Sequence, residues 1–166
     1  MIEVNNLTTN PVDKEFLKRV AKKALIGENK ERLELSVVLV GQSRIRKLNK
    51  KYRKKNKVTD ILSFGDDLNE IVICLGEVEK NAKKYNSTSK KELAKVLIHG
   101  ILHLLGYDHE KGEAKKGEES KLSSSTELLQ EAKVKKKVEP SSPPFAAARE
   151  MKEKEDYYLR KIYGQE

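Results

Sequence analysis

Alternation of apolar and polar residues predicts short strands in the first half of the chain. Ile2 to Asn6 alternates, and so does Leu33 to Leu39, where Val38 and Val40 add apolar side chains on the opposite face. A strand that is apolar on both faces is buried on both, so we expect it in the middle of a sheet. Two further apolar runs, 60–64 and 70–75, flank a turn and suggest a hairpin.

Apolar residues at helical spacing predict the remaining elements. We expect helices over 11–27, 43–52, 76–85, 89–105 and 145–163. The expected helix starts are Asn10 followed by Pro11, Ser43, and Ser89 paired with Glu92 as a capping box.

These elements predict an α+β fold, with a small mixed four-stranded sheet and helices packed mainly on one side. Residues 1–110 would form the core. Residues 111–144 are rich in Lys, Glu, Ser and Pro and poor in large apolar side chains, which predicts a low-complexity, disordered insert or linker. Helical spacing returns in 145–166, which we expect to form a C-terminal helix that packs back on the core.

The composition fits a single domain with an aliphatic core. The chain has 166 residues, 37% of them hydrophobic, with one Cys and no Trp. Cys74 lies in an apolar strand, so we expect it in the core, and a lone Cys indicates a reduced, cytoplasmic setting. Because no apolar run reaches the length of a signal peptide or a membrane span, we expect no membrane partner.

All the histidines of the chain lie in one stretch, from His99 to His109, at the spacing H-x3-H-x5-H. On a helix, His99 and His103 project from the same face, one turn apart. Gly106 can take the left-handed conformation that stops a helix, and the chain can then bring His109 toward the first two. Three imidazoles suit zinc and leave a fourth position open, as in catalytic sites. The sequence therefore predicts a zinc site on a helix and the following turn, at the edge of the sheet.

The spacing is close to the zinc signature of metzincin proteases, H-E-x-x-H-x-x-G-x-x-H. That signature needs Glu in its second position as the general base, and here the position is Gly100. A metalloprotease is therefore a less favoured alternative.

Positive charge is concentrated in residues 41–60, which carry +8 of the net charge of +9. The cationic side chains are Arg44, Arg46, Lys47, Lys50, Lys51, Arg53, Lys54, Lys55 and Lys57. They occupy one face of a predicted helix, whose Ile45, Leu48 and Tyr52 would face inward, and the loop after it. Such a concentration is typical of a surface that binds a polyanion, although a solvated helix face has the same pattern.

The histidine stretch, H-G-I-L-H-L-L-G-Y-D-H, resembles the signature of the YbeY family of bacterial endoribonucleases. Lys51-Tyr52-Arg53 followed by Thr59 to Phe64 resembles the family's Y-R-x-x-x-x-x-T-D-V-L-S-F segment, and Ile71 to Cys74 resembles its second hairpin strand. The chain departs from the family pattern at Val58, where Pro is usual, and at Asn69-Glu70, where Gly-Asp is usual.

The resemblance implies a zinc-dependent endoribonuclease that acts in the maturation of ribosomal RNA, at the 16S rRNA 3′ end, and in ribosome quality control. It implies one Zn2+ held by His99, His103 and His109. Its partners would be ribosomal RNA and pre-ribosomal particles. It also implies that Arg53 acts in cleavage, where it would hold the scissile phosphate.

The residues leave several points open. Asp108 adjoins a predicted ligand, and either orients an imidazole or serves in the turn that ends the helix. A metal-activated water and a ribose 2′-hydroxyl are both candidate nucleophiles. A second function remains possible, a non-catalytic ribosome-assembly factor that binds RNA and uses zinc for structure.

Overall fold

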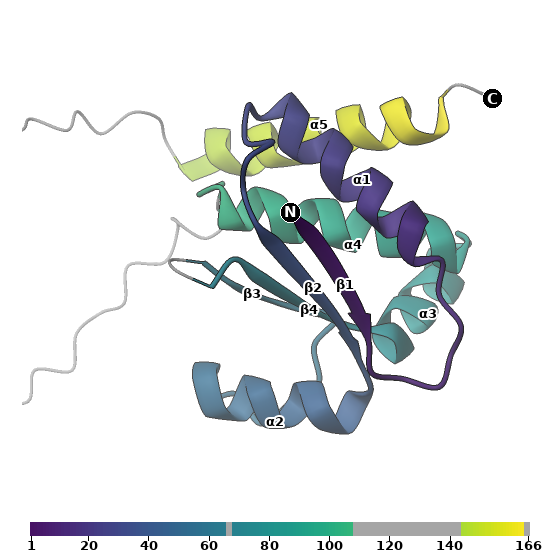
Figure 1. The fold of residues 1–166 in the computed structure, drawn as a ribbon. Coiled ribbons are helices and arrows are strands. Elements are labelled where there is room, and N and C mark those ends of the chain that lie inside the picture. The colour runs from purple at the N-terminus through teal and green to yellow at the C-terminus, as the bar shows by residue number, and fades with distance from the viewer. Residues whose placement is uncertain (66–67, 108–143, 165–166) are drawn as a thin grey trace, which may run out of the picture.

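The computed structural model describes residues 1–65, 68–107 and 144–164 (Figure 1). Residues 111–144, predicted as an insert, lie outside this range except for Pro144, and so do Asp108 and His109. The elements in chain order are β1 (Ile2–Asn6), α1 (Lys14–Gly27), β2 (Leu35–Val40), α2 (Gln42–Arg53), β3 (Ile61–Phe64), β4 (Glu70–Cys74), α3 (Leu75–Lys84), α4 (Ser89–Leu104) and α5 (Pro144–Tyr163).

The strands form one mixed sheet in the order β1-β2-β4-β3. β2 is parallel to both of its neighbours, with Val37 opposite Val4 and Ile71, and β3 runs antiparallel to β4. The predicted α+β fold with a mixed four-stranded sheet is confirmed. The prediction that the strand apolar on both faces is central is also confirmed, because β2 lies between β1 and β4.

The helices cover the two faces of the sheet unequally. α1, α4 and α5 lie on one face, and α2 lies alone on the other (Figure 1). The larger hydrophobic cluster fills the space between the sheet, α1 and α4, and a smaller cluster under α2 contains Ile45, Leu62 and Cys74. Cys74 is fully buried, as expected for a core residue, and burial raises the pKa of its thiol.

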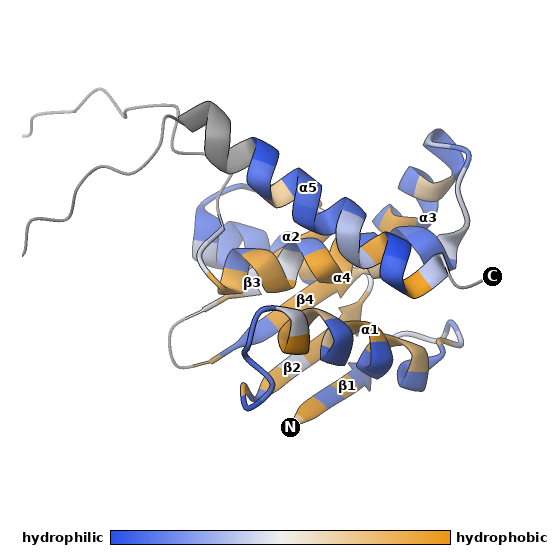
Figure 2. Ribbon diagram, turned by 90° about the horizontal axis from the view of Figure 1, so that it is seen from above, coloured by the Kyte–Doolittle hydropathy of each residue, from blue (hydrophilic) through white to orange (hydrophobic). Residues whose placement is uncertain are grey.

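α4 is the central helix of the larger layer. Leu97, Ile98, Ile101 and Leu102 are fully buried, and Figure 2 shows α4 as a largely hydrophobic helix beside the more hydrophilic α5. α5 packs against α4 and α1, with Met151 and Tyr158 inward. A helix enclosed in this way is held on most of its sides, which makes it a rigid support for polar side chains.

The predicted helix N-caps are wrong by one to three residues. α1 is capped by Asp13, whose Oδ1 accepts from the Phe16 amide at 2.8 Å, and α4 is capped by Thr88, whose Oγ1 accepts from the Lys91 amide at 3.2 Å. α2 follows Gly41 without a side-chain cap. Several residues of the capping type stand near each start, and tertiary packing decides between them. Tyr52, predicted to face inward, is 55% exposed.

Candidate functional site

α4 brings His99 and His103 together on one face. Their Nε2 atoms lie 3.0 Å apart, and the rings are edge-on with centroids 4.5 Å apart. Two ligand nitrogens on a tetrahedral zinc lie about 3.3 Å apart, given Zn–N bonds of about 2.0–2.1 Å. Both side chains are half-buried. The pair therefore presents two nitrogens at a separation that suits a shared metal ion.

The second nitrogen of His99 is held by a carboxylate from α5. Nδ1 of His99 lies 2.5 Å from Oε1 of Glu155, whose side chain is 10% exposed. A carboxylate only accepts hydrogen bonds, so Nδ1 carries the proton. In the neutral imidazole, Nε2 is then the nitrogen that carries the lone pair, and it is the atom that faces His103.

α4 ends in a motif that reverses the chain just before the third histidine. Gly106 has φ of +92°, its amide donates to the His103 carbonyl, and the Tyr107 amide donates to the Leu102 carbonyl, both at 3.0 Å. These are the two hydrogen bonds of a Schellman motif. The left-handed conformation predicted for Gly106 is confirmed. Asp108 and His109 follow outside the described residues, so their roles remain predictions.

The buried side chain of Glu28 holds Tyr107, in the segment that follows α4. Glu28, at the end of α1, accepts from Lys154 and Tyr158 of α5, each at 2.7 Å, and from the hydroxyl of Tyr107 at 2.9 Å. Burial by itself raises the pKa of Glu28, but the three hydrogen bonds outweigh burial and lower it below 4.5. Glu28 therefore stays ionised and ties α1, α5 and Tyr107 together.

Gly100 faces the sheet, away from the histidine pair. A Cβ atom at Gly100 would lie 2.5 Å from Cδ1 of Ile61 and 3.1 Å from Cδ1 of Ile71. A side chain at this position would have to displace the side chains of Ile61 and Ile71. The contact is consistent with Gly at the position where a metalloprotease has its catalytic Glu.

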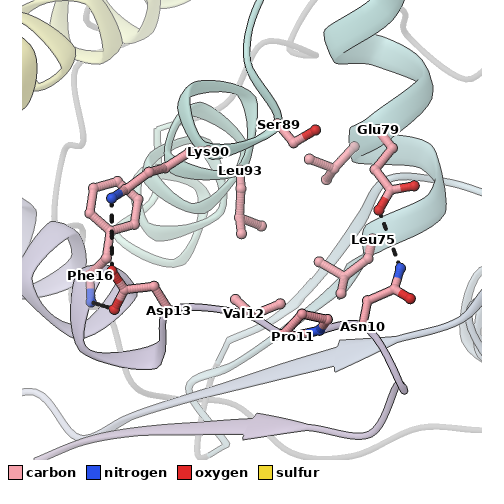
Figure 3. A pocket seen from close by; sticks show the side chains of 11 residues that line it. Asn10, Pro11, Val12, Asp13, Phe16, Leu75, Glu79, Ser89, Lys90 and Leu93 are labelled. Carbon is pink, nitrogen blue, oxygen red and sulfur yellow. Dashed lines mark hydrogen bonds and ion pairs between the residues drawn. The ribbon is translucent and has the colours of Figure 1, made fainter.

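A cleft of about 570 Å³ adjoins His99. Residues of α3, α4, α5 and the start of β3 line it, and His99 and Glu155 lie in its wall. Another pocket, of about 200 Å³, lies between the start of α1, α3 and the start of α4 (Figure 3). Its α4 residues, Ser89, Lys90 and Leu93, are up to ten positions before His99, which is roughly 15 Å along a helix. The cleft is therefore the one associated with the candidate site.

Arg53 lies at the last position of α2, across the sheet from α4. The nine cationic residues of 41–60, which we call the basic cluster, are all exposed. The loop after α2 folds back on the helix, because buried Asn49 donates to the Lys57 carbonyl at 2.8 Å and Lys54 takes a left-handed conformation. The structure thus gathers the helix and loop charges on one surface, but it does not bring Arg53 to the histidine pair on the same face of the sheet.

β3, at the edge of the sheet, lies between the two groups of residues. The Ser63 hydroxyl donates to the Gly100 carbonyl of α4 at 3.4 Å, whereas the ring of Phe64 lies against Tyr52 of α2, with centroids 5.1 Å apart. Adjacent strand residues point to opposite faces, so this one strand contacts both helices.

The donor set of the histidine pair fits zinc, since imidazole nitrogen is one of its preferred ligands. Within the described ranges, His, Cys, Asp and Glu side chains form no cluster of three or more with metal-binding geometry. The third predicted ligand, His109, lies beyond those ranges. Of the helices that the structure describes, none is long and apolar enough to cross a membrane.

The fold and the paired histidines define an α+β protein with a nitrogen-donor site on its central helix. The family model described as Endoribonuclease YbeY matches residues 3–132, and the chain belongs to this family. Membership supports an RNA-cleaving, endonucleolytic role for the chain.

Relatives and a solved structure agree with this assignment. The chain is 40% identical to the endoribonuclease YbeY of Aquifex aeolicus over 123 residues, covering 69% of this chain and 79% of the relative. It is 44% identical to that of Thermotoga maritima over 101 residues, covering 58% and 64%. A solution structure of a Thermotoga maritima protein matches with a TM-score of 0.58 and 28% identity, covering 99% of this chain and 91% of that one.

Sequence reasoning missed Glu155 and Glu28. Glu155 lies on the same helical stripe as Met151 and Tyr158, four residues after one and three before the other. A carboxylate in the middle of a predicted apolar stripe was the available signal, because a buried carboxylate requires a partner. Glu28 carried no such signal, since it follows a helix end where polar residues are common.

Proposed function

We propose that this chain is a zinc-dependent endoribonuclease, with one Zn2+ held by His99, His103 and His109. The observation that carries the proposal is the pair of Nε2 atoms, 3.0 Å apart on one face of α4, with the opposite nitrogen of His99 on a carboxylate. Neutral imidazoles with fixed tautomers are the form in which His binds metal.

Zinc would supply Lewis acidity at a phosphate oxygen and lower the pKa of a water toward about 7. The residues of the chain would hold and orient the metal ligands. His99 and His103 hold their nitrogens in place on a buried helix, and Asp108, which adjoins the third proposed ligand in the sequence, would orient an imidazole. The cleft beside His99 is large enough to admit part of an RNA strand.

The basic cluster would bind the RNA backbone. Nine exposed cations on one helix and its following loop attract phosphates and release their counterions. Arg53, at the end of the helix, presents a planar fork that can grip a phosphate in two places. RNA that passes over the edge strand β3 would touch both the basic cluster and the cleft, since β3 contacts α2 and α4.

The proposed substrate is ribosomal RNA in pre-ribosomal particles, with the 16S rRNA 3′ end as the processed site and ribosome quality control as a second role in the cytoplasm. This assignment of substrate is supported by the resemblance of the H-x3-H-x5-H stretch and of the Tyr52-Arg53 segment to the family's motifs. The concentrated positive charge agrees with an RNA substrate.

The test is the cleavage of a structured RNA by highly purified protein, comparing wild type with His103→Ala. Lys91→Ala is the matched control, because Lys91 is an exposed residue in the first turn of the same helix. We expect cleavage by wild type and the control and loss of cleavage in His103→Ala. Equal cleavage by all three would indicate a contaminating nuclease and favour the non-catalytic assembly factor.

Metal analysis tests the site itself. We expect one zinc per chain in wild type and loss of zinc in His99→Ala, His103→Ala and His109→Ala. Full zinc occupancy in any two of these variants would contradict the proposed ligands.

A further inference from the structure

We propose that Glu155, from the C-terminal helix, is a positioning residue for the metal ligand His99. The inference rests on the proposed function, because it assigns a residue to the same metal site. Its role would be to hold the His99 imidazole in one tautomer and one orientation, with Nε2 directed toward the metal.

The contact between the two side chains is short and largely shielded from water. Nδ1 of His99 lies 2.5 Å from Oε1 of Glu155, and the side chains are 29% and 10% exposed. A hydrogen bond to an ionised acceptor is shorter and stronger than one between neutral groups. Because the carboxylate cannot donate, the contact forces the proton onto Nδ1.

The proton on Nδ1 determines which nitrogen of His99 can bind a metal. With Nδ1 protonated, Nε2 keeps its lone pair, and Nε2 is the atom that faces His103 at 3.0 Å. Ligating histidines commonly donate their second N–H to a carboxylate, which raises the basicity of the ligand and fixes its orientation. At His99, Nδ1 contacts the Glu155 carboxylate, and Nε2 faces His103 at the proposed metal position.

Glu155 is itself held firmly. Its neighbours on the inner stripe of α5, Met151 and Tyr158, are at most 2% exposed. Tyr158 and Lys154 both donate to Glu28 at 2.7 Å. The ring of Tyr158 lies so close over Gly27 that a Cβ atom there would overlap it. The carboxylate therefore sits on a rigid element, which a positioning group requires.

The same turn of α5 also contacts Tyr107, toward the C-terminal end of the histidine stretch. Glu28, which binds Lys154 and Tyr158, accepts from the hydroxyl of Tyr107 at 2.9 Å. Lys154 also lies over the Tyr107 ring, with Nζ 4.8 Å from its centroid. Tyr107 stands two residues before His109. One helical turn of α5 thus contacts the first ligand and anchors the segment that leads to the third.

The alternative is a purely structural role, in which Glu155 only attaches α5 to α4. The two roles differ in what a Gln replacement does. Gln keeps the size of the side chain and offers one carbonyl acceptor, so it preserves packing, but it removes the charge and admits the opposite tautomer of His99. A positioning residue would lose metal affinity in Glu155→Gln without a matching loss of stability.

The experiment compares Glu155→Gln and Glu155→Ala with Glu153→Gln in the full chain. Glu153 is the matched control, because it is on the same helix, has a 71% exposed side chain and pairs with Arg149 across the helix surface at 3.8 Å. Zinc affinity is measured by competition with a chelator, and the visible absorption of Co2+-loaded protein reports the ligand geometry. The thermal midpoint of the metal-free protein reports stability.

We expect Glu155→Ala to weaken zinc binding by about 10–100-fold, the usual effect of losing such an outer partner, and Glu155→Gln to lose less. Both should change the Co2+ spectrum, and Glu153→Gln should change neither readout. Unchanged zinc affinity and an unchanged spectrum in Glu155→Gln and Glu155→Ala would overturn the inference while leaving the proposed function intact. If wild type itself bound no zinc, or if His103→Ala bound it equally well, the metal site and the inference would both be wrong.

Discussion

Gly100 of α4 lies so close to Ile61 that any added side chain would have to displace the end of the Ile61 side chain. A Cβ atom on Gly100 would lie 2.5 Å from Cδ1 of Ile61, in the edge strand β3. This contact sets how closely α4 approaches the sheet, and therefore where His99 and His103, on either side of Gly100 in the sequence, stand relative to β3.

We expect Gly100→Ala to destabilise the fold by about 1–3 kcal/mol, because an extra methyl group in a filled core forces its neighbours to move. Gly76→Ala is the control, since the nearest atoms to a Cβ there belong to the flexible Gln42 side chain, the first of them at 3.3 Å. Gly76 lies in a helix, so this change should be neutral or stabilising by up to about 1 kcal/mol. Urea unfolding of the metal-free proteins measures both. Equal stability of the two variants would show that α4 can shift at no cost.

The Glu28 carboxylate should make the stability depend on pH in acid. Its pKa is lowered in the fold, so its contribution is fully present above the ordinary value of 4.5 and is lost as the pH falls through the folded-state pKa. Lys154, whose pKa is raised by its hydrogen bond to Glu28 against the effect of burial, keeps its contribution up to at least 10.5. The stabilisation should therefore be constant between these two limits.

We expect Glu28→Gln to lose about 1.5–3 kcal/mol near neutral pH, since it weakens hydrogen bonds to a charged acceptor. The difference from wild type should shrink below pH 4.5. Glu31→Gln, at an exposed position, should differ little from wild type at any pH. Denaturation of the metal-free proteins over a series of pH values measures the differences. A difference for Glu28→Gln that stayed constant into strong acid would contradict the assignment.

Substitutions of Arg53 and of a neighbouring lysine should have different effects on RNA cleavage and RNA binding. Arg53→Lys keeps the charge but loses the planar fork, so we expect nearly normal affinity and single-turnover cleavage slower by about 10²-fold, as for loss of one transition-state donor. Lys55→Ala should behave in the opposite way, with weaker binding, a salt slope smaller by about 0.7, and normal cleavage at saturating RNA. Wild-type cleavage by Arg53→Lys would show that Arg53 is only one more charge in the basic cluster.

Tyr52 should contribute a stacking surface to RNA binding. It is 55% exposed within the basic cluster, and its ring is supported edge-on by Phe64. Stacking of a base on an aromatic side chain contributes about 1–3 kcal/mol, so Tyr52→Ala should weaken binding of single-stranded RNA by roughly 5–100-fold. Duplex RNA, whose bases are paired and stacked, should bind almost as before.

Two variants serve as controls for Tyr52. Tyr52→Phe keeps the ring and should bind single strands like wild type. Tyr157→Ala removes a tyrosine that is 48% exposed on α5, outside both the basic cluster and the cleft lining, and should have no effect. If Tyr157→Ala reduced affinity as much as Tyr52→Ala, the loss would not be specific to a stacking surface at Tyr52.

The fold could be predicted from the sequence because its main features are periodic and local. The alternation in β2 and the helical spacing in α4 depend only on neighbouring residues, and so does the placement of His99 and His103 on one face. The N-cap of α4 was predicted one residue late, at Ser89 instead of Thr88, because both are good caps and the sequence does not distinguish them.

The support of the site depends on contacts that no local pattern contains. The carboxylate of Glu155 reaches His99 across 56 residues, and Glu28 reaches Tyr107 across 79. Residues 111–144 lie between His99 and Glu155 in the sequence. Three strands and three helices lie between Glu28 and Tyr107. Only the tertiary arrangement of α1, α4 and α5 brings these groups together.

The separation of His99 and Glu155 along the chain has a consequence for the order of synthesis. A ribosome adds about 5–20 residues per second, so the 56 residues between them take roughly 3–11 s. During that interval the nascent chain carries His99 and His103 but lacks the carboxylate that α5 provides. The proposed metal site would thus lack the Glu155 carboxylate until α5 has been synthesised.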